Sequence, residues 1–180
     1  VVFGGQGASP ASREMTNQFV DDGAVARYDL SRMAWSTPST AKGTPEPRAR
    51  HAAAEIEDKI YFWGGYTRLW NADAYPKWAA SAPQSPPGTW DDDYDGQPTD
   101  VLVFDSITSE WSTLDVNRTV RPTPRFYHAM GGAGDKLIMF GGFTQQDVFT
   151  TSFGTRDDAK FLGDSWVLDL SRSTPRWEEL

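Results

Sequence analysis

The sequence predicts an all-β protein built from a repeated set of short antiparallel strands. An apolar run ends in two glycines at three places in the chain: residues 1–5, 60–65 and 137–142. Each of these runs is followed by a second apolar run that ends in aspartate, and then by a tryptophan. No segment shows the sustained periodicity of a helix with a cap at each end. A unit that recurs in this order indicates a repeat architecture.

The first unit, residues 1–44, begins with a glycine-pair strand. Its aspartate strand covers residues 24–29, and Trp35 follows. Both strands are short, and turn residues bound them, which is typical of antiparallel sheets. We expect this unit to supply the last three strands of a four-stranded sheet.

The second and third units, residues 45–115 and 120–180, contain one additional element. Each has the string Pro-Arg-x-x-His upstream of its glycine pair, and the two histidines, His51 and His128, lie at the same distance before that pair. They are the only histidines in the chain. Trp111 and Trp177 complete these units, so we expect each unit to form all four strands.

The ordered string Pro-Arg-x-x-His, apolar-Gly-Gly, apolar-Asp and Trp resembles the kelch repeat. The resemblance implies that each unit is a four-stranded antiparallel blade of a β-propeller. Residues 1–44 would then be a partial blade (strands 2–4), and residues 45–115 and 120–180 would be complete blades. Propellers have about 4–8 blades, so we expect an incomplete ring whose remaining blades belong to a longer protein.

The repeated residues have structural roles in this interpretation. Paired glycines allow backbones to approach closely and adopt positive φ. The tryptophans would fill the space between neighbouring blades. We expect Arg48 and Arg125 to hold neighbouring blades together by pairing with aspartates, and His51 and His128 to serve the scaffold.

Composition narrows the classes of function. The chain has 180 residues, a formal net charge of −8 and no cysteine. The acidic balance argues against nucleic-acid binding and favours a basic partner. No run reaches transmembrane length, which argues against a membrane protein. We expect a cytoplasmic protein, because nothing suggests disulfides or a signal peptide.

The segments between the glycine pair and the next strand vary most between units. They cover residues 6–23, 66–99 and 143–163, and in an antiparallel blade all three connect strand 2 to strand 3. Successive turns of such a blade alternate between two faces, so all three 2→3 loops should lie on the same face. Long loops on a rigid scaffold are typical binding elements.

The 66–99 loop combines aromatic, proline and acidic residues. Tryptophan and tyrosine often anchor interfaces, and a flexible linker would be poor in them. Two alternatives remain open, namely that the loop docks a partner or that it packs back on its own propeller. The candidate partner-binding residues are Trp70, Tyr75, Trp78, Trp90, Asp91, Asp92, Asp93, Tyr94 and Asp95.

The acidic end of this loop also resembles the start of a calcium loop. Asp91, Asp93 and Asp95, followed by a glycine, have the alternating spacing of calcium ligands. An EF-hand would need glutamate at the position of Leu102 and flanking helices. Integrin-type calcium loops end in aspartate where this chain has Thr99. We therefore expect a solvated acidic loop and predict no metal or cofactor.

No catalytic arrangement is evident in the sequence. His51 and His128 belong to different units, and no Cys or His-x-x-x-His spacing accompanies them, which argues against a zinc site. We therefore predict a non-enzymatic protein–protein interaction module, acting as a scaffold or recognition subunit through its long loops. The alternative is part of a kelch-like metalloenzyme, of the oxidase or specifier-protein type, whose site lies in other blades.

Overall fold

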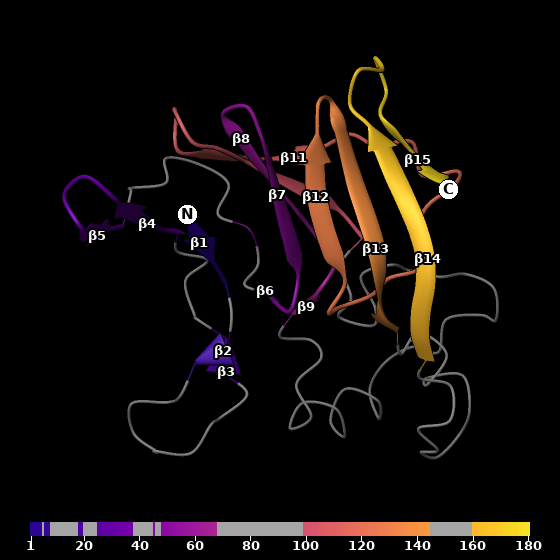
Figure 1. The fold of residues 1–180 in the computed structure, drawn as a ribbon, viewed down its shortest axis with the longest axis horizontal. Coiled ribbons are helices and arrows are strands. Elements are labelled where there is room, and N and C mark those ends of the chain that lie inside the picture. The colour runs from indigo at the N-terminus through magenta and orange to yellow at the C-terminus, as the bar shows by residue number, and fades with distance from the viewer. Residues whose placement is uncertain are drawn as a thin grey trace, which may run out of the picture.

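The computed structural model describes residues 1–4, 6–7, 18–19, 25–37, 45, 48–67, 99–144 and 160–180. Their strands form three main antiparallel sheets that lie side by side in chain order (Figure 1). The all-β prediction is confirmed, since the regular elements of this part of the chain are strands. None of the described residues belongs to a helix long and apolar enough to cross a bilayer.

The first sheet has three strands in the order β1-β4-β5. They are β1 (Val2–Phe3), β4 (Val25–Asp29) and β5 (Ala34–Ser36). Phe3 of β1 lies opposite Val25 of β4. All three strands lie within residues 1–44.

The second and third sheets have four strands each, paired in chain order. The second contains β7 (Ala52–Ile56), β8 (Lys59–Trp63), β10 (Val101–Asp105) and β11 (Glu110–Leu114). The third contains β12 (Ala129–Ala133), β13 (Lys136–Thr144), β14 (Lys160–Asp169) and β15 (Arg176–Glu179). The first strands of these two sheets, β7 and β12, lie next to each other.

The core consists of two layers, one on each side of the second sheet. Strand β10 shows the reason, because successive side chains of a strand point to opposite faces. Val101 and Val103 pack with residues of the third sheet, whereas Leu102 and Phe104 pack with residues of the first. All four side chains are buried. An unbroken apolar strand therefore forms the middle of the three sheets.

The tryptophans fill these layers in two of the three units. Trp111 contacts Phe3 of the first sheet at 4.7 Å between ring centroids, and Trp177 contacts Trp63 of the second at 5.6 Å. Both Trp111 and Trp177 are buried. Trp35 differs, since it is 63% exposed on the outward face of the first sheet. The expected role between blades is therefore seen for Trp111 and Trp177, whereas for Trp35, which lies on an outer face of the described sheets, it stays a prediction.

The aspartate that ends the third strand of each unit closes the turn that follows. Oδ1 of Asp29, Asp105 and Asp169 accepts a hydrogen bond from the backbone N–H two residues later, at 2.8, 2.9 and 3.1 Å. Hydrogen bonds from the Ser171 hydroxyl and from Arg172 lower the pKa of Asp169 to about 2. The repeated aspartate is therefore a turn-forming residue.

The sequence interpretation, in which each glycine pair ends the second strand, holds for β1 and β8, which end directly before Gly4 and Gly64, but not for β13. Strand β13 passes through Gly141 and Gly142 with a shift in register and continues to Thr144, opposite Lys160. The reason is that both glycines adopt positive φ, which bends the chain into a bulge without stopping its pairing. The proposed 143–163 loop is thus narrowed to residues 145–159.

The other two units also show pairing beyond their glycine pairs. Strand β2 (Gln6–Gly7) pairs with β3 (Gln18–Phe19), and β6 (Arg48–Ala49) pairs with β9 (Tyr66–Thr67). The described ends of the 2→3 loops lie in the lower part of Figure 1, whereas the tight hairpins of the second and third sheets lie in its upper part. We call the lower side the loop face.

Glycine permits the close contact between neighbouring sheets at this face. Gly64 has φ +68°, and an added Cβ would lie 2.6 Å from the carbonyl oxygen of Arg125 and 2.7 Å from the His128 ring. An added Cβ at Gly4 would likewise overlap the carbonyl oxygen of Arg48 and lie 3.2 Å from the ring of His51, both in the second unit. The first glycine of the first and second pairs, Gly4 and Gly64, therefore lies against the arginine carbonyl and the histidine ring of the following unit.

Candidate functional site

The residues singled out for partner binding lie outside the described part of the chain. They are Trp70, Tyr75, Trp78, Trp90, Asp91, Asp92, Asp93, Tyr94 and Asp95. The proposed calcium ligands belong to this group. Their assignment therefore stays a prediction, and the described residues show the surface from which the loop starts and to which it returns.

The root of each loop is fixed by backbone hydrogen bonds. The N–H of Gly65 donates to the carbonyl of Arg125 at 2.9 Å, which joins the second unit to the third. In the third unit Phe126 and Phe143 exchange two bonds, of 3.0 and 2.8 Å. The loops therefore start from a paired and rigid base.

Two buried arginines hold the third strand of their own sheets, Arg48 through Asp100 just before β10 and Arg125 through Asp164 within β14. Arg125 donates to both carboxylate oxygens of Asp164, at 2.5 and 2.8 Å, and Arg48 donates to both oxygens of Asp100, at 3.1 and 3.2 Å. The hydrogen bond from Arg125, together with one from Trp166, lowers the pKa of Asp164 to about 2. Arg125 donates from two nitrogens, one to each oxygen, and such a two-point pair sets orientation as well as energy, whereas Arg48 donates to both oxygens from Nη2 alone.

This geometry corrects the expected role of Arg48 and Arg125. Each pairs with an aspartate, as expected, but the aspartate belongs to the same unit as the arginine. Each arginine reaches an aspartate of its own unit, because Asp100 directly precedes β10 and Asp164 lies within β14, beside the segments that carry Arg48 and Arg125. Links between neighbouring units include the hydrogen bonds from Gly65 N–H to the Arg125 carbonyl, from Tyr127 N–H to the Arg50 carbonyl and from Arg27 Nη2 to the Ser106 carbonyl.

The two histidines pack against aromatic rings of the preceding unit. His128 lies 5.3 Å from Trp63, and His51 lies 5.5 Å from Phe3, between ring centroids. Burial, reinforced by nearby arginines, lowers the pKa of His128 to about 3 and that of His51 to about 4. Both rings are therefore neutral near pH 7, and their placement agrees with the expected scaffold role.

The residue just before each histidine is exposed: Arg50 precedes His51, and Tyr127 precedes His128. Arg50 and Tyr127 have the same position in their repeats, with φ of +58° and +59°. The N–H of Tyr127 donates to the carbonyl of Arg50 at 3.1 Å, and the Arg50 guanidinium lies 4.6 Å from the Tyr127 ring centroid. Positive φ is costly for such residues and is found preferentially at functional sites.

A row of phenylalanines continues from this pair across the loop face. Phe126 contacts Tyr127 at 5.1 Å, Phe143 contacts Phe126 at 5.3 Å, and Phe161 contacts Phe143 at 5.3 Å. Tyr127 is 60% exposed and Phe161 87%. We call Arg50, Phe126, Tyr127, Phe143 and Phe161 the aromatic rim.

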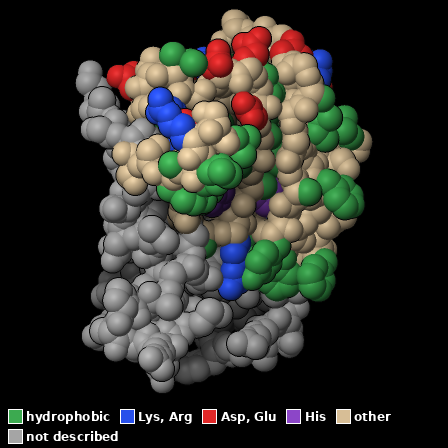
Figure 2. Space-filling model, turned by 60° about the vertical axis from the view of Figure 1, so that its left-hand side comes forward, with side chains coloured by type: hydrophobic (Ala, Val, Ile, Leu, Met, Phe, Trp, Pro, Cys, Tyr) green, Lys and Arg blue, Asp and Glu red, His purple; other side chains and the backbone are tan. Residues whose placement is uncertain are grey.

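The surface around the histidines also combines hydrophobic and basic side chains. Figure 2 shows the two histidines in a recess, with a basic side chain and a hydrophobic patch below them and acidic side chains along the upper edge. The aromatic rim was not predicted from the sequence. The sequence shows only that Arg50 and Tyr127 occupy equivalent positions in two strings that align with each other.

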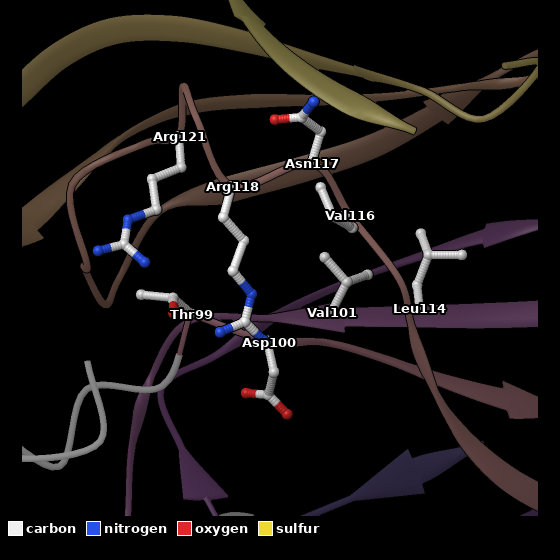
Figure 3. A pocket seen from close by; sticks show the side chains of 8 residues that line it. All are labelled: Thr99, Asp100, Val101, Leu114, Val116, Asn117, Arg118 and Arg121. Atoms are coloured by element: carbon white, nitrogen blue, oxygen red, sulfur yellow. The ribbon is translucent and has the colours of Figure 1, made fainter. Parts of the chain in front are cut away.

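A small hollow lies between the second sheet and the segment that leads to the third. Figure 3 shows its lining residues, which come from the ends of β10 and β11 and from this connecting segment. They are Thr99, Asp100, Val101, Leu114, Val116, Asn117, Arg118 and Arg121. Two guanidinium groups therefore lie at a hollow whose one described acidic side chain is Asp100.

The chemistry available to the described residues is that of binding. Within this part of the chain, no group of three or more His, Cys, Asp or Glu side chains is placed to hold a metal ion. The two neutral histidines have aromatic neighbours and lie under the glycine pairs of the preceding unit. The aromatic rim offers exposed rings and a cation, which are common anchors of protein interfaces.

Comparison with protein families identifies the repeat. The family described as "Kelch motif" matches residues 47–116. The matched region contains the second sheet, from the Pro-Arg-x-x-His segment to the end of the fourth strand.

Curated proteins with similar sequences cover most of this chain but exceed it in length. Host cell factor 2 of Homo sapiens is 27% identical over 81% of this chain and 17% of its own length. The N-(sulfonatooxy)prop-2-enimidothioate sulfolyase of Thlaspi arvense is 30% identical over 66% of this chain and 28% of its own length. The Rab9 effector protein with kelch motifs of Bos taurus is 29% identical over 64% of this chain and 25% of its own length.

A solved structure shares the fold. The structure of YjhT matches with a TM-score of 0.64 and 16% sequence identity, covering 99% of this chain and 47% of its own. The three sheets of this chain therefore have the arrangement of consecutive blades in that structure.

Proposed function

Because the chain belongs to the kelch-repeat family, we propose that it contributes to a β-propeller whose loop face binds another protein. In this role it is a scaffold or recognition subunit of a larger complex. The chain spans 17–28% of the length of the curated relatives described above. The proposal therefore concerns the surface that this part contributes.

The observation that carries the proposal is the aromatic rim. Tyr127 and Phe161 expose large rings next to the Arg50 cation, on a base held by backbone hydrogen bonds. Exposed aromatic and arginine side chains on a rigid base make effective interface anchors, because little conformational entropy is lost when they bind. Positive φ at Arg50 and Tyr127 supports the same interpretation, since unfavourable backbone is retained where it serves a function.

The 66–99 loop extends this surface in the proposal. It starts at the β6–β9 ladder and returns at Thr99, both on the loop face. Its aromatic residues would add contacts beyond those of the aromatic rim. The partner is a protein with a basic surface, because the net charge of −8 attracts such a partner over long distances.

The relatives include a protein whose name describes binding. The Rab9 effector protein with kelch motifs is called an effector, a word used for proteins that bind a regulatory partner. Transferred to this chain, the likeness supports a binding role without naming the partner.

Deletion of residues 70–95 tests the proposal. We expect the shortened chain to keep its far-UV circular dichroism spectrum and its cooperative melting, because the described sheets do not include these residues. We also expect it to lose at least one protein that the intact chain captures from an extract of its source. Recovery of every partner by the shortened chain would contradict the role of the loop.

A second candidate function is suggested by the sulfolyase relative. In that case the chain would contribute blades to a kelch-like enzyme of the oxidase or specifier-protein type, with the reacting site in other blades. Metal analysis of the purified full-length protein distinguishes the two proposals. Stoichiometric metal would favour the enzyme, and its absence after purification without chelator would contradict a metalloenzyme of this type.

The outward faces of the first and third sheets suggest another set of partners. Trp35 and Val2 are exposed on the first sheet, and Ile138 and Phe140 on the third. In the proposed ring these faces pack against further blades. Small-angle scattering of the full-length protein should then give a compact, disc-shaped particle.

A further inference from the structure

The row of three sheets ends in an exposed apolar face on each side, one on the first sheet and one on the third (Figure 1). We propose that the outer face of the third sheet packs against the outer face of the first sheet in a second copy of this chain. The contact forms twice between two copies, once in each direction, and closes a ring. These faces do not include the aromatic rim, so the inference goes beyond the proposed function.

The outer face of the first sheet carries a tryptophan that is buried in the other two units. Trp35 follows its aspartate strand as Trp111 and Trp177 follow theirs. Trp111 packs against Phe3 of the preceding unit, at 4.7 Å between ring centroids. Trp177 packs in the same way against Trp63, at 5.6 Å. In both contacts the tryptophan meets the aromatic residue directly before a glycine pair, and such a residue would complete the same contact for Trp35.

The third sheet presents this aromatic residue on its own outer face. Phe140 directly precedes the third glycine pair, as Phe3 and Trp63 precede the first and second. Its side chain is 57% exposed, whereas those of Phe3 and Trp63 are buried between sheets. One copy therefore carries Phe140 at one end of the row and Trp35 at the other, which are the two halves of the repeated contact.

Further apolar side chains lie beside these two rings. On the first sheet, Tyr28 lies 5.0 Å from Trp35 between ring centroids, and Val2 is exposed on the same face. On the third sheet, Ile138 is exposed beside Phe140, because side chains two residues apart in a strand point to the same face. Contiguous exposed apolar side chains of this kind mark interaction sites.

The charge on the outer face of the third sheet is compensated within that sheet. Glu178 lies opposite Val167, in the same row as Ile138. It accepts hydrogen bonds from Arg172 and Arg176, at 3.0 and 2.7 Å. A carboxylate that is already paired costs less to bury than an unpaired one. Glu178 is therefore compatible with packing against an apolar face.

Two copies have the amount of structure that a closed ring needs. They bring together six main sheets, three from each copy, and known propellers have about 4–8 blades. This chain matches 47% of the YjhT chain, so two copies correspond to nearly its whole length. A contact between two different faces closes into a ring when the rotation between copies returns to its start. A second copy satisfies this condition and supplies both halves of the contact.

The test is sedimentation equilibrium of the 180-residue chain over a range of concentrations. We expect the mass of two chains at micromolar concentration. Trp35→Ser and Phe140→Ser should each raise the dissociation constant of the dimer about a hundredfold, because each removes an aromatic anchor from both contacts. A mixture of the two variants retains one intact contact per dimer, so it should associate more tightly than either variant alone.

The matched control is Ile107→Ser. It removes an exposed apolar side chain from the hairpin between β10 and β11, away from both outer faces. It should leave the dissociation constant unchanged. Far-UV circular dichroism of each variant shows whether the sheets are retained, so that a loss of association can be assigned to the contact.

The proposal is wrong if the unaltered chain stays monomeric, which is the result expected if repeats of a longer protein cover these faces instead. Growth into open polymers would also contradict a closed ring of two copies. If only one of Trp35→Ser and Phe140→Ser weakens the dimer, two like faces are in contact and the proposed pairing is wrong. A monomeric chain that still captures a partner through Tyr127 would leave the proposed function intact.

Discussion

At the scale of single residues, the ion pair between Arg125 and Asp164 connects the fold with its loop face. The Arg125 side chain is fully buried, and it also donates to the carbonyls of Thr123 and Gly141. One guanidinium group therefore holds the segment before His128, the bulge of β13 and the middle of β14. Removing the partner of a buried charge costs far more than the pair contributes.

We expect Asp164→Asn to lower the free energy of unfolding by about 3 kcal/mol, measured by urea denaturation. Asp100→Asn is the matched comparison, because its bonds to Arg48 are longer, at 3.1 and 3.2 Å. It should cost less than Asp164→Asn. Equal stability of Asp164→Asn and the unaltered chain would show that the pair does not hold this region.

The buried histidines make stability depend on pH. Desolvation, with help from Arg125, holds the pKa of His128 at about 3, below the ordinary histidine value of 6.5. In the unfolded chain the ring takes up a proton below pH 6.5, but in the folded chain it does not. Stability is therefore complete above pH 6.5 and falls as the pH decreases toward about 3 for His128 and about 4 for His51.

We expect the melting temperature to decrease from pH 6.5 to pH 4, and this decrease to be smaller in His128→Gln. The variant is less stable at pH 7 because it loses the contact with Trp63. The comparison therefore concerns the slope of the melting temperature against pH, and not the melting temperature itself. Asp164 contributes to the slope only below pH 4, since its pKa falls from 3.8 to about 2. An unchanged slope in the variant would contradict the histidine assignment.

At the scale of elements, the repeated residues form the contact between neighbouring sheets, which we call the seam. The glycine pair of one unit lies against the Pro-Arg-x-x-His segment of the next, and the ring of the histidine lies over the glycine. The Gly65 N–H donates to the Arg125 carbonyl across this seam. A side chain at Gly64 would separate the two segments.

We expect Gly64→Ala to destabilise the chain by about 2 kcal/mol or more, since it combines positive φ with overlap against backbone. Gly131→Ala is the control, because a Cβ at that position in β12 would have no atom within 4 Å. It should leave stability unchanged or raise it slightly. Equal effects of the two substitutions in thermal melts would contradict the packing role of the seam.

The elements also show how much could be predicted from the sequence. The strands of the three sheets were located by aligning the repeats, because apolar runs between turn residues define short strands well. The continuation of β13 beyond Gly142 was not predicted, since a bulge depends on backbone dihedrals that allow pairing to resume. The pairing of Arg125 with Asp164 inside one sheet depends on three-dimensional distance, which periodicity does not specify.

The candidate site was less predictable than the fold. The sequence directs attention to unusual composition, and the 66–99 loop is the most unusual segment of the chain. The aromatic rim was overlooked because Arg50 and Tyr127 differ in residue type and occupy a variable position of the repeat. Their shared backbone conformation relates them, and this becomes visible only in the structure.

At the scale of the whole molecule, three sheets present two faces with different chemistry. The hairpins of one face are closed by aspartates such as Asp105 and Asp169. The loop face carries the aromatic rim and the arginines of the connecting segment. The sheets contribute rigidity, and recognition is proposed to depend on what this face presents.

The most direct test of the loop face as a binding surface measures capture of partners by three forms of the chain. Tyr127→Asn removes the exposed ring but keeps a residue that tolerates positive φ. Leu30→Ser removes an apolar side chain that is 84% exposed, more than Tyr127 at 60%, from a hairpin of the first sheet. The unaltered chain is the third form. Captured proteins from an extract of the source are quantified by mass spectrometry.

We expect at least one protein enriched by the unaltered chain to be recovered about tenfold less with Tyr127→Asn and equally well with Leu30→Ser. Matching melting temperatures of the three forms would show that binding, and not folding, has changed. Equal recovery of every captured protein by all three forms would contradict the claim that the loop face is the binding surface.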